Sequence, residues 1–460
     1  MKLTLWHDST TPAATIEVDS KNPAACSLVY NENWLGGLSG HALSPALAQP
    51  KRAEMTQAEH AECLVRFFAN WLPEGQALDA AAQALKVSKA SLFGLLLGLG
   101  KELPSAFSLT IEGSPIEPWE PALRALTRQE LSERIAARHD IPFGLWDGKV
   151  RLSIAGYQDK IGVYERAGRW FLVDGARHAS THILKPEPQS DLLCGLVSNE
   201  FFCMRLARAA GMDCALVELH HVPQPVLAIR RFDRRLRPDG SVERMAVIDG
   251  CQALDLSVGQ KYERPFGDGR DVAHVRDGAS VPALFAAIGD HAAKQRAAAR
   301  LQLLRWVILQ VLLGNTDAHA KNISFFSSRH GLAQTPSYDL VCGLVFAGQA
   351  VEESLAMAIG DTFDPLKVRA YDWAQMAYQS GVPAGVVGRE LQRLANAFLT
   401  ALPTVREEVL AAGAQPDMVD QVAQVVTGQC EQALKDASRV KNVDVGLFEE
   451  QGSGASRPKP

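Results

Sequence analysis

The sequence DAHAKN occupies residues 317–322, and Asp339 follows it seventeen residues later, at the end of the sequence SYD. An acid, four residues and then an asparagine is the spacing of the catalytic loop in phosphoryl-transfer enzymes. There the acid orients or deprotonates a substrate hydroxyl and the asparagine holds magnesium. Asp339 stands where a second, metal-binding acid is expected. The spacing alone is common, because Asp and Asn also form turns and helix caps. It nevertheless predicts a phosphoryl-transfer site centred on Asp317.

The residues on either side of this segment support that prediction. Residues 301–313 read LQLLRWVILQVLL, which is too apolar all round for a surface helix and too short to span a bilayer, so we expect a buried helix. Residues 323–326 and 332–337 read as two short strands joined by a polar, glycine-containing turn. Folded as a hairpin, they bring Asn322 and Asp339 side by side, and two oxygen ligands suit Mg²⁺.

The composition is that of an ordinary soluble protein. The 460 residues are enough for two or three domains, and they are 47% hydrophobic and 22% charged. The net charge is −5, and no basic run is long enough to indicate nucleic-acid binding by the chain as a whole. The eight cysteines are scattered, without a CxxC pair, which favours a reducing compartment. We expect a cytoplasmic protein without a signal peptide or membrane span.

Strands are expected mainly in the first half of the chain and helices in the second. Residues 78–85 and 89–99 form a weak helix-turn-helix candidate, but the second helix is apolar and broken by glycine, so a packed helical cap is favoured. Residues 233–280 read as a long polar stretch, after which helices continue to about residue 440. A further helix is expected at 58–71 and another at 191–210. The expected strands are 150–154, 160–164, 170–173, 182–185, 215–222 and 226–232.

The strand-rich half contains candidates for a nucleotide site. The sequence SIAGYQDK, residues 153–160, lies between two strands, and its small residues would let backbone N–H groups approach phosphate oxygens; an ordinary hairpin turn would look the same. Lys185 ends an apolar strand and can neutralise phosphates, and Glu200 is its candidate ionic partner, although both could be solvated. Residues 229–235, IRRFDRR, fall where a hinge that pairs with adenine is expected, or form a phosphate or nucleic-acid patch.

His319 and Lys321 lie beside the candidate acid. Either could steady the transferred phosphoryl group, because charge stabilisation dominates this chemistry, and either could equally be a surface residue.

Seven motifs carry a family resemblance. They are SIAGYQDK (153–160), THILK (181–185), NE (199–200), RRFDRR (230–235), GNTDAHAKN (314–322), PSYD (336–339) and ESLAMAIG (353–360). In this order and spacing the chain resembles the HipA family of bacterial toxin serine/threonine kinases. DAHAKN with SxAGxQxK upstream is specific as a combination, and weaker matches extend over nearly the whole chain.

The resemblance implies a two-lobed, protein-kinase-like α+β fold. Residues 1–110 would form an extra N-terminal subdomain of strands and helices. Residues 111–235 would form the β-rich N-lobe with the phosphate loop, and residues 236–449 the mostly helical C-lobe with the catalytic loop and metal site. Residues 450–460 would be a flexible tail.

The resemblance also implies ATP and Mg²⁺ as cofactors, and a role for each candidate residue. Asp317 would be the catalytic acid, assisted by Lys185; His319 and Lys321 are the catalytic candidates named above for their charge and their place beside the acid. Asn322 and Asp339 would bind magnesium. Lys185 would contact the ATP phosphates, and Arg231 and Phe232 would lie at the adenine. Ser153, Ile154, Ala155, Gly156, Tyr157 and Gln158 would bind the nucleotide, and Ser153 matches the serine that the family autophosphorylates to silence the kinase.

The implied partners are a small helix-turn-helix antitoxin of the HipB type, which alone contacts operator DNA, and a protein substrate such as an aminoacyl-tRNA synthetase. The chain departs from the family at Arg230, where an acidic residue is frequent, and in a short segment after Lys185. Two alternatives remain: a small-molecule kinase of the aminoglycoside-phosphotransferase kind, and a co-repressor with a vestigial site. Retention of Lys185, Asp317, Asn322 and Asp339 argues against the second.

Overall fold

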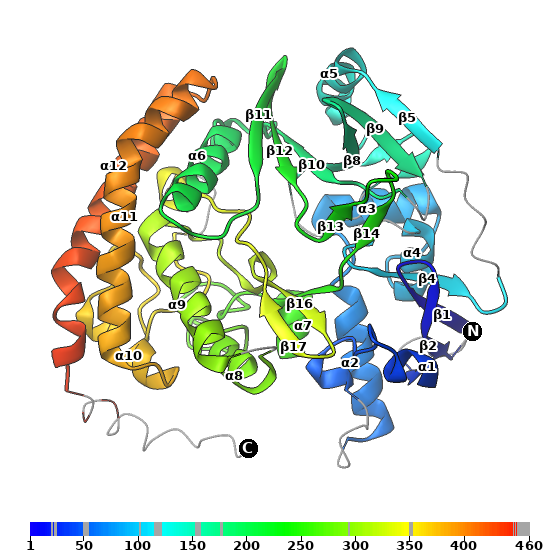
Figure 1. Cartoon of the computed structure of the whole chain (residues 1–460), viewed down its shortest axis with the longest axis horizontal. Coiled ribbons are helices and arrows are strands. Elements are labelled where there is room, and N and C mark those ends of the chain that lie inside the picture. The colour runs from blue at the N-terminus through cyan, green and yellow to red at the C-terminus, as the bar shows by residue number, and fades with distance from the viewer. Residues whose placement is uncertain are drawn as a thin grey trace. The chain divides into compact units, whose positions relative to one another are not determined.

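The computed structural model describes residues 1–19, 22, 25–48, 55–100, 103–114, 122–151, 158–174, 178–292, 295–348, 353–444, 446 and 448. The chain forms two compact units (Figure 1). The first comprises Met1–Val197, Ala215–Val258 and Ser324–Pro336, and the second comprises Ser198–Cys214, Gly259–Ile323 and Ser337–Pro460. Each unit is therefore assembled from segments that are far apart in the sequence.

The first unit begins with a four-stranded antiparallel sheet in the order β3-β2-β1-β4. Leu3 and Leu5 of β1 are fully buried while Thr4 between them is not, so the strand turns one face to the core. Thr56 and Glu59 form a reciprocal capping box that starts α2. The elements are β1 (Lys2–His7), β2 (Thr11–Val18), β3 (Cys26–Tyr30), β4 (Phe107–Ile111), α2 (Gln57–Ala69), α3 (Gly75–Leu85) and α4 (Leu92–Leu99).

Helix α4 confirms the packed cap expected from the sequence. Its large side chains Phe93, Leu95, Leu96 and Leu99 are buried, and the helix packs against β4 of the first sheet. An apolar helix of this kind gains its stability from tertiary burial, so it belongs to the core of the N-terminal region.

The second sheet of the first unit is six-stranded and antiparallel, in the order β11-β12-β10-β8-β9-β5. Helix α5 covers one of its faces, where Leu131 and Ile135 share a core with Leu184 of β10. The strand expected at 150–154 is described only at its start, and residues 152–157 lie outside the described part of the chain. The elements are β5 (Ala122–Leu126), α5 (Arg128–Ala136), β8 (Ile161–Arg166), β9 (Arg169–Asp174), β10 (His182–Pro186), β11 (Val217–Val222) and β12 (Gln224–Arg230).

A third sheet of the first unit contains the hairpin predicted between the two candidate metal ligands. Strands β16 (Ser324–Ser328) and β17 (Gly331–Gln334) are antiparallel, and the pairing of Ser328 with Gly331 leaves only two residues for the turn. The predicted hairpin is confirmed, with a tighter turn than expected. Strand β15 (Val247–Asp249) pairs with the other edge of β16.

The polar stretch at 233–280 contains short regular elements that were not assigned from the sequence. These are β13 (Arg234–Leu236), β14 (Val242–Arg244), β15 and helix α7 (Gly250–Leu254). Elements of three to five residues are shorter than the window over which hydrophobic periodicity can be recognised.

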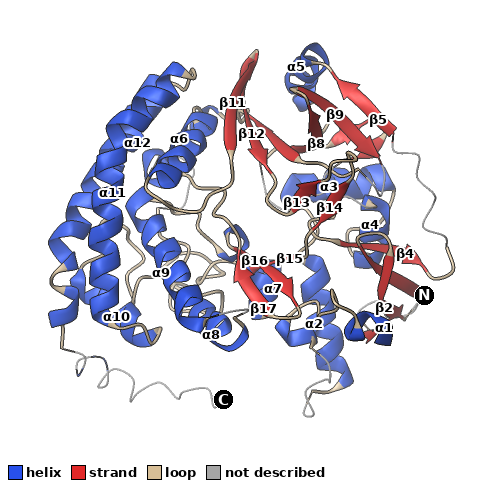
Figure 2. Ribbon diagram, viewed as in Figure 1, coloured by secondary structure: helices blue, strands red, loops and turns tan. Residues whose placement is uncertain are grey.

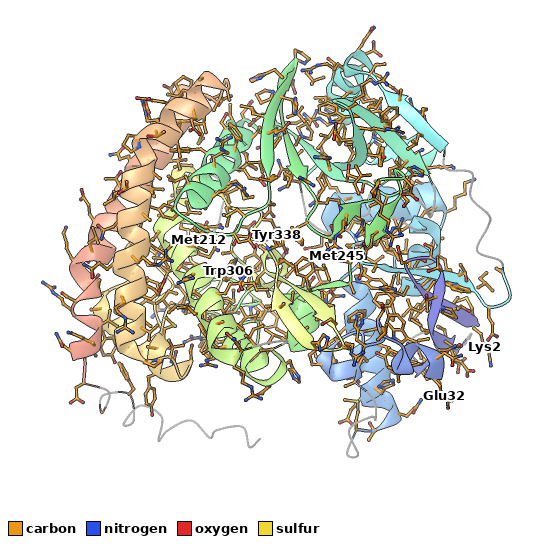
Figure 3. The ribbon with its side chains drawn as sticks, viewed as in Figure 1. Lys2, Glu32, Met212, Met245, Trp306 and Tyr338 are labelled. Carbon is orange, nitrogen blue, oxygen red and sulfur yellow. The ribbon has the colours of Figure 1, made fainter. Side chains whose placement is uncertain are left out.

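The second unit is helical (Figure 2), and the buried helix predicted at 301–313 lies at its centre. This helix, α9, contacts α8, α11 and α12, and Trp306 on it is buried (Figure 3). It ends at Gly314, whose positive φ of 63° lets its N–H reach the carbonyls of Gln310 and Val311. The helices are α6 (Leu196–Ala209, from Ser198 onward in this unit), α8 (Val281–His291), α9 (Arg296–Leu313), α10 (Ala370–Gln379), α11 (Ala384–Ala411) and α12 (Pro416–Ala437).

Within the described residues, no helix combines the length and the apolar character that a bilayer span requires.

Candidate active site

The candidate catalytic segment starts directly at the end of α9 and is tied to it. The side-chain amide of Asn315 donates to Oε1 of Gln310 at 2.8 Å, and its carbonyl oxygen accepts the backbone N–H of Asp317 at 3.1 Å. Asn315 is buried and therefore fixed in place. The backbone of Asp317 is thus held by the last turn of a rigid buried helix.

The Asp317 carboxylate is accessible, because 47% of its side chain is exposed. Its Oδ1 accepts a hydrogen bond from the Tyr262 hydroxyl at 2.7 Å and lies 3.9 Å from Nε2 of His319. The rings of Tyr262 and His319 meet edge to face at 5.0 Å. An exposed carboxylate with one oxygen engaged can present the other to a substrate hydroxyl.

Asn322 is oriented by the same segment. Its side-chain nitrogen donates to the backbone oxygen of Asp317 at 2.7 Å, and the side chain is buried. Because the nitrogen is used in this way, the amide oxygen is the atom left for a cation. The acid and the asparagine of the DAHAKN motif are therefore coupled to each other.

Asp339 is brought near this segment through its neighbour Tyr338, which is labelled in Figure 3. The Tyr338 hydroxyl donates to the backbone oxygen of Lys321 at 2.7 Å. Tyr338 directly precedes Asp339 and Lys321 directly precedes Asn322, so this hydrogen bond joins the two segments. Asp339 has a φ of 56°, a conformation that non-glycine residues adopt rarely and that occurs at functional sites. Carboxylate and amide oxygens on adjoining segments are a donor set that suits Mg²⁺, which takes its other ligands from phosphate and water.

His319 and Lys321 are both buried rather than on the surface, each 7% exposed. The described residues contain no group of three or more His, Cys, Asp or Glu side chains arranged to hold a metal ion. A magnesium site made of one Asp and one Asn does not require such a cluster.

Lys185 lies in the first unit, on central strand β10, where its register partner on β12 is Leu227. It is 5% exposed, so the exposed strand-end alternative is wrong. Successive side chains of a strand point to opposite faces, and Leu184 packs in the core under α5, so Lys185 points away from that core. Glu200 on α6 is 1% exposed, which excludes a solvated helix face. Its ion pair with Lys185 stays a prediction.

Arg231 is part of a buried ion cluster. Its guanidinium donates to both oxygens of Asp233, at 3.0 and 2.7 Å, and to Oγ of Ser180 at 2.8 Å. Arg234 donates to the same carboxylate at 2.5 Å. Arg231 and Arg234 are therefore both buried and paired with Asp233, and the phosphate or nucleic-acid patch considered from the sequence stays a prediction. Phe232 packs edge to face on Phe326 of β16, with ring centres 6.0 Å apart. The predicted adenine contacts of Arg231 and Phe232 remain predictions.

The predicted phosphate loop is only partly described. Ser153, Ile154, Ala155, Gly156 and Tyr157 lie outside the described residues, and Gln158 is half-buried.

Tyr262 and the residues that support it were not expected from the sequence. Tyr262 precedes Asp317 by 55 positions, and no motif or periodic pattern links the two. The next residue, Glu263, contacts the conspicuous ESLAMAIG motif, with its backbone N–H donating to the Ala356 carbonyl and its carboxylate accepting from the Ala358 N–H. The motif was recognised, but its contact with Glu263 was not.

Comparison with known proteins identifies two family domains. The HipA N-terminal domain matches residues 4–110 and the HipA-like C-terminal domain matches residues 152–402. The chain is 36% identical over 423 residues to the serine/threonine-protein kinase toxin HipA of Shewanella oneidensis, covering 90% of this chain and 92% of that protein. It is 32% identical over 387 residues to a putative kinase of Sinorhizobium fredii, covering 82% and 86%.

The structure is similar to that of the Shewanella oneidensis HipA, solved in complex with HipB and its operator DNA. The TM-score is 0.82 at 32% identity, over 96% of this chain and 100% of that one. This similarity confirms the expected kinase-like α+β fold.

Proposed function

The chain belongs to the HipA family of serine/threonine-protein kinase toxins, and we propose that it transfers the γ-phosphoryl group of Mg·ATP to a serine or threonine of a host protein. The observation that supports this most is the catalytic segment itself. The Asp317 carboxylate is exposed, and the backbone oxygen of Asp317 accepts a hydrogen bond from the Asn322 side chain. One hydrogen bond from Tyr338, the residue before Asp339, reaches the same segment at Lys321.

Each residue has a defined task in this proposal. Asp317 orients the substrate hydroxyl and accepts its proton, and the oxygens of Asn322 and Asp339 hold Mg²⁺. When bound, the metal neutralises charge on the phosphates and aligns the transferred group. Lys185 neutralises the ATP phosphates as a point charge. His319 and Lys321, both buried beside the acid, add positive or hydrogen-bonding groups near the transferred phosphoryl.

We propose that residues 153–158 bind the nucleotide phosphates and that Arg231 and Phe232 lie at the adenine. Ser153 is the proposed autophosphorylation site, at which an added charge of about −1.5 to −2 would oppose phosphate binding by the same loop. This self-modification would silence the kinase.

The proposed partner is a helix-turn-helix antitoxin of the HipB type, since the similar Shewanella structure contains HipA, HipB and operator DNA. The net charge of −5 favours DNA contact through that antitoxin rather than through this chain. The proposed substrate is a translation-related protein such as an aminoacyl-tRNA synthetase, and the proposed location is the cytoplasm.

Incubation of the purified protein with labelled ATP, Mg²⁺ and a bacterial lysate tests the proposal. Asp317→Ala and Asp339→Ala should each lower phosphoryl transfer by about 10²-fold or more without unfolding the protein, because general acid–base and metal-binding groups contribute on that scale. Asp290→Ala, at an exposed position on α8, is the matched control and should remain active.

In the same samples EDTA should abolish transfer, and mass spectrometry should find phosphate on Ser153 of the wild type and of Asp290→Ala but not of the two active-site variants. Activity retained by either active-site variant, or in EDTA, would show that the assignment is wrong.

A further inference from the structure

Tyr262 lies on a segment, residues 259–280, that precedes α8. The two ends of this segment are hydrogen-bonded to each other. The Ala279 N–H donates to the Gln260 carbonyl at 2.9 Å, and the Gly278 N–H donates to the Glu263 carbonyl at 3.2 Å. The backbone at Gly278 approaches Tyr262 so closely that a Cβ there would lie 1.8 Å from the Tyr262 carbonyl oxygen. Only glycine fits this contact. The two ends of the segment, residues 260–263 and 278–279, therefore pack backbone against backbone, and together they form its base.

Two hydrogen bonds join this base to the catalytic segment. The Tyr262 hydroxyl donates to Oδ1 of Asp317 at 2.7 Å, and the Ala320 N–H donates to the Lys261 carbonyl at 3.0 Å. The ring of Tyr262 also rests edge to face on His319 at 5.0 Å. Tyr262 therefore contacts the DAHAKN segment through its hydroxyl and its ring, while the carbonyl of its neighbour Lys261 holds the backbone of Ala320.

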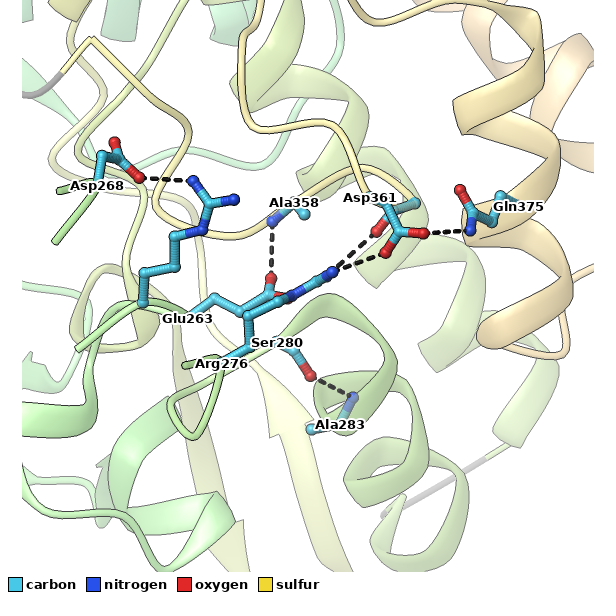
Figure 4. Close-up of polar contacts among 10 residues, drawn as sticks. Glu263, Asp268, Arg276, Ser280, Ala283, Ala358, Asp361 and Gln375 are labelled. Carbon is cyan, nitrogen blue, oxygen red and sulfur yellow. Dashed lines mark hydrogen bonds and ion pairs between the residues drawn. The ribbon is translucent and has the colours of Figure 1, made fainter. Parts of the chain in front are cut away.

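Glu263 anchors the base from the other side (Figure 4). Its carboxylate is 4% exposed, accepts the Ala358 N–H at 2.8 Å and pairs with Arg276, whose Nε lies 2.6 Å from it. Arg276 also reaches Asp361 at 2.6 Å, and Asp361 accepts from Gln375 of α10 at 2.6 Å (Figure 4). This chain of contacts ties the residue next to Tyr262 to the helical body of the second unit.

We propose that Tyr262 is a positioning residue for the phosphoryl transfer, which fixes the Asp317 carboxylate in one rotamer. Its hydroxyl occupies Oδ1 and so directs Oδ2 toward the substrate hydroxyl. A half-exposed aspartate without this contact would rotate freely about its side-chain bonds, and small errors in the placement of a reacting group have large effects on rate. The proposal rests on the role given above to Asp317.

Tyr262→Phe in the full-length chain tests this. It removes one oxygen and leaves the ring that packs on His319. We expect kcat to fall about tenfold or more, with the KM for ATP unchanged within twofold, because the lost contact concerns the acid and not the nucleotide. Tyr378→Phe is the matched control: Tyr378 is an exposed tyrosine of α10 whose ring packs on Phe448, and its loss should change neither constant.

A second measurement requires no activity. Hydrogen exchange followed by mass spectrometry should show several-fold faster exchange in peptides covering residues 314–323 of the Tyr262→Phe protein, and no change in the control. Unchanged exchange would overturn the positioning contact whether or not the wild type is active. If the Tyr262→Phe protein exchanges faster but the wild type transfers no phosphate, the positioning contact is supported and the proposed function is wrong.

Two kinetic outcomes would also overturn the inference. An unchanged kcat would show that the contact is a structural detail. A higher kcat would show that the tyrosine hydroxyl competes with the substrate for Asp317.

Discussion

Asp233 is the residue whose replacement should destabilise the first unit most strongly. Its buried carboxylate accepts hydrogen bonds from Arg231 and Arg234, and both guanidinium groups are themselves almost inaccessible. Burial alone would raise the pKa of Asp233, but the charges of Arg231 and Arg234 outweigh it and hold the pKa well below its usual range. The carboxylate is therefore ionised in the folded protein and neutralises two buried cations.

The magnitude follows from this arrangement. Asp233→Asn keeps the shape of the side chain but leaves two guanidinium groups buried without their anion, and breaking a buried ion pair in this way costs about 3–5 kcal/mol. The pH dependence has a defined sign. Since the folded-state pKa lies below the unfolded value of about 3.9, the ionised carboxylate contributes its full stability above that pH and loses it as the pH falls further.

Urea unfolding of the full chain at several pH values measures both effects. The difference between wild type and Asp233→Asn should be equal at pH 7 and pH 5 and should shrink below about pH 4. Asp239→Asn, on an exposed turn of the same unit, is the control and should change stability by about 0.5 kcal/mol or less. Adding Arg231→Gln to Asp233→Asn should recover part of the lost free energy of unfolding, because it removes one buried guanidinium group that no longer has an anion beside it. A loss of under about 1 kcal/mol in Asp233→Asn would refute the reasoning.

Two further substitutions test how the second unit holds the candidate catalytic segment. Gly343→Ala would place a methyl carbon 2.0 Å from Oγ1 of Thr316, so we expect a loss of about 1–3 kcal/mol in urea unfolding together with lower kinase activity. Asn199 exchanges two hydrogen bonds with the buried backbone of Cys342, at 2.7 and 3.0 Å. Asn199→Ala should therefore cost about 1–3 kcal/mol for each group left unsatisfied, and a thermal midpoint equal to that of the wild type would contradict this.

The parts of the site that are local in sequence could be predicted from it. The apolar run of α9, the glycine that ends it and the hairpin β16–β17 all follow from patterns within about twenty residues. Because the hairpin reverses the chain direction, the residues after it lie near those before it, and the Tyr338 hydroxyl donates a hydrogen bond to the Lys321 carbonyl. Asp339 is thereby placed near Asn322. Spacing alone could therefore relate the acid, the asparagine and the second acid.

The burial of charged groups could not be predicted in the same way. The sequence RRFDRR contains four arginines and one acid, and the sequence alone indicates either a hinge or a phosphate or nucleic-acid patch. Whether Arg231 and Arg234 face water or share Asp233 depends on Ser180 and Leu103, which come from distant parts of the chain. Pairing of buried charges is a property of tertiary structure, because its cost and its gain both depend on the local dielectric.

The support of Asp317 shows the same dependence on long-range contacts. The residues that fix it are Asn315, two positions before it, Asn322, five positions after it, and Tyr262, 55 positions before it. The segment 317–322 contains only a single 3₁₀ turn, Ala320–Asn322, so regular backbone hydrogen bonding cannot hold the acid in place. Side chains must do so instead, and they can be supplied from any part of the fold that reaches the loop. The DAHAKN motif could thus be recognised from its spacing, whereas the contact between Asp317 and Tyr262 could not, because Tyr262 lies outside every recognised motif.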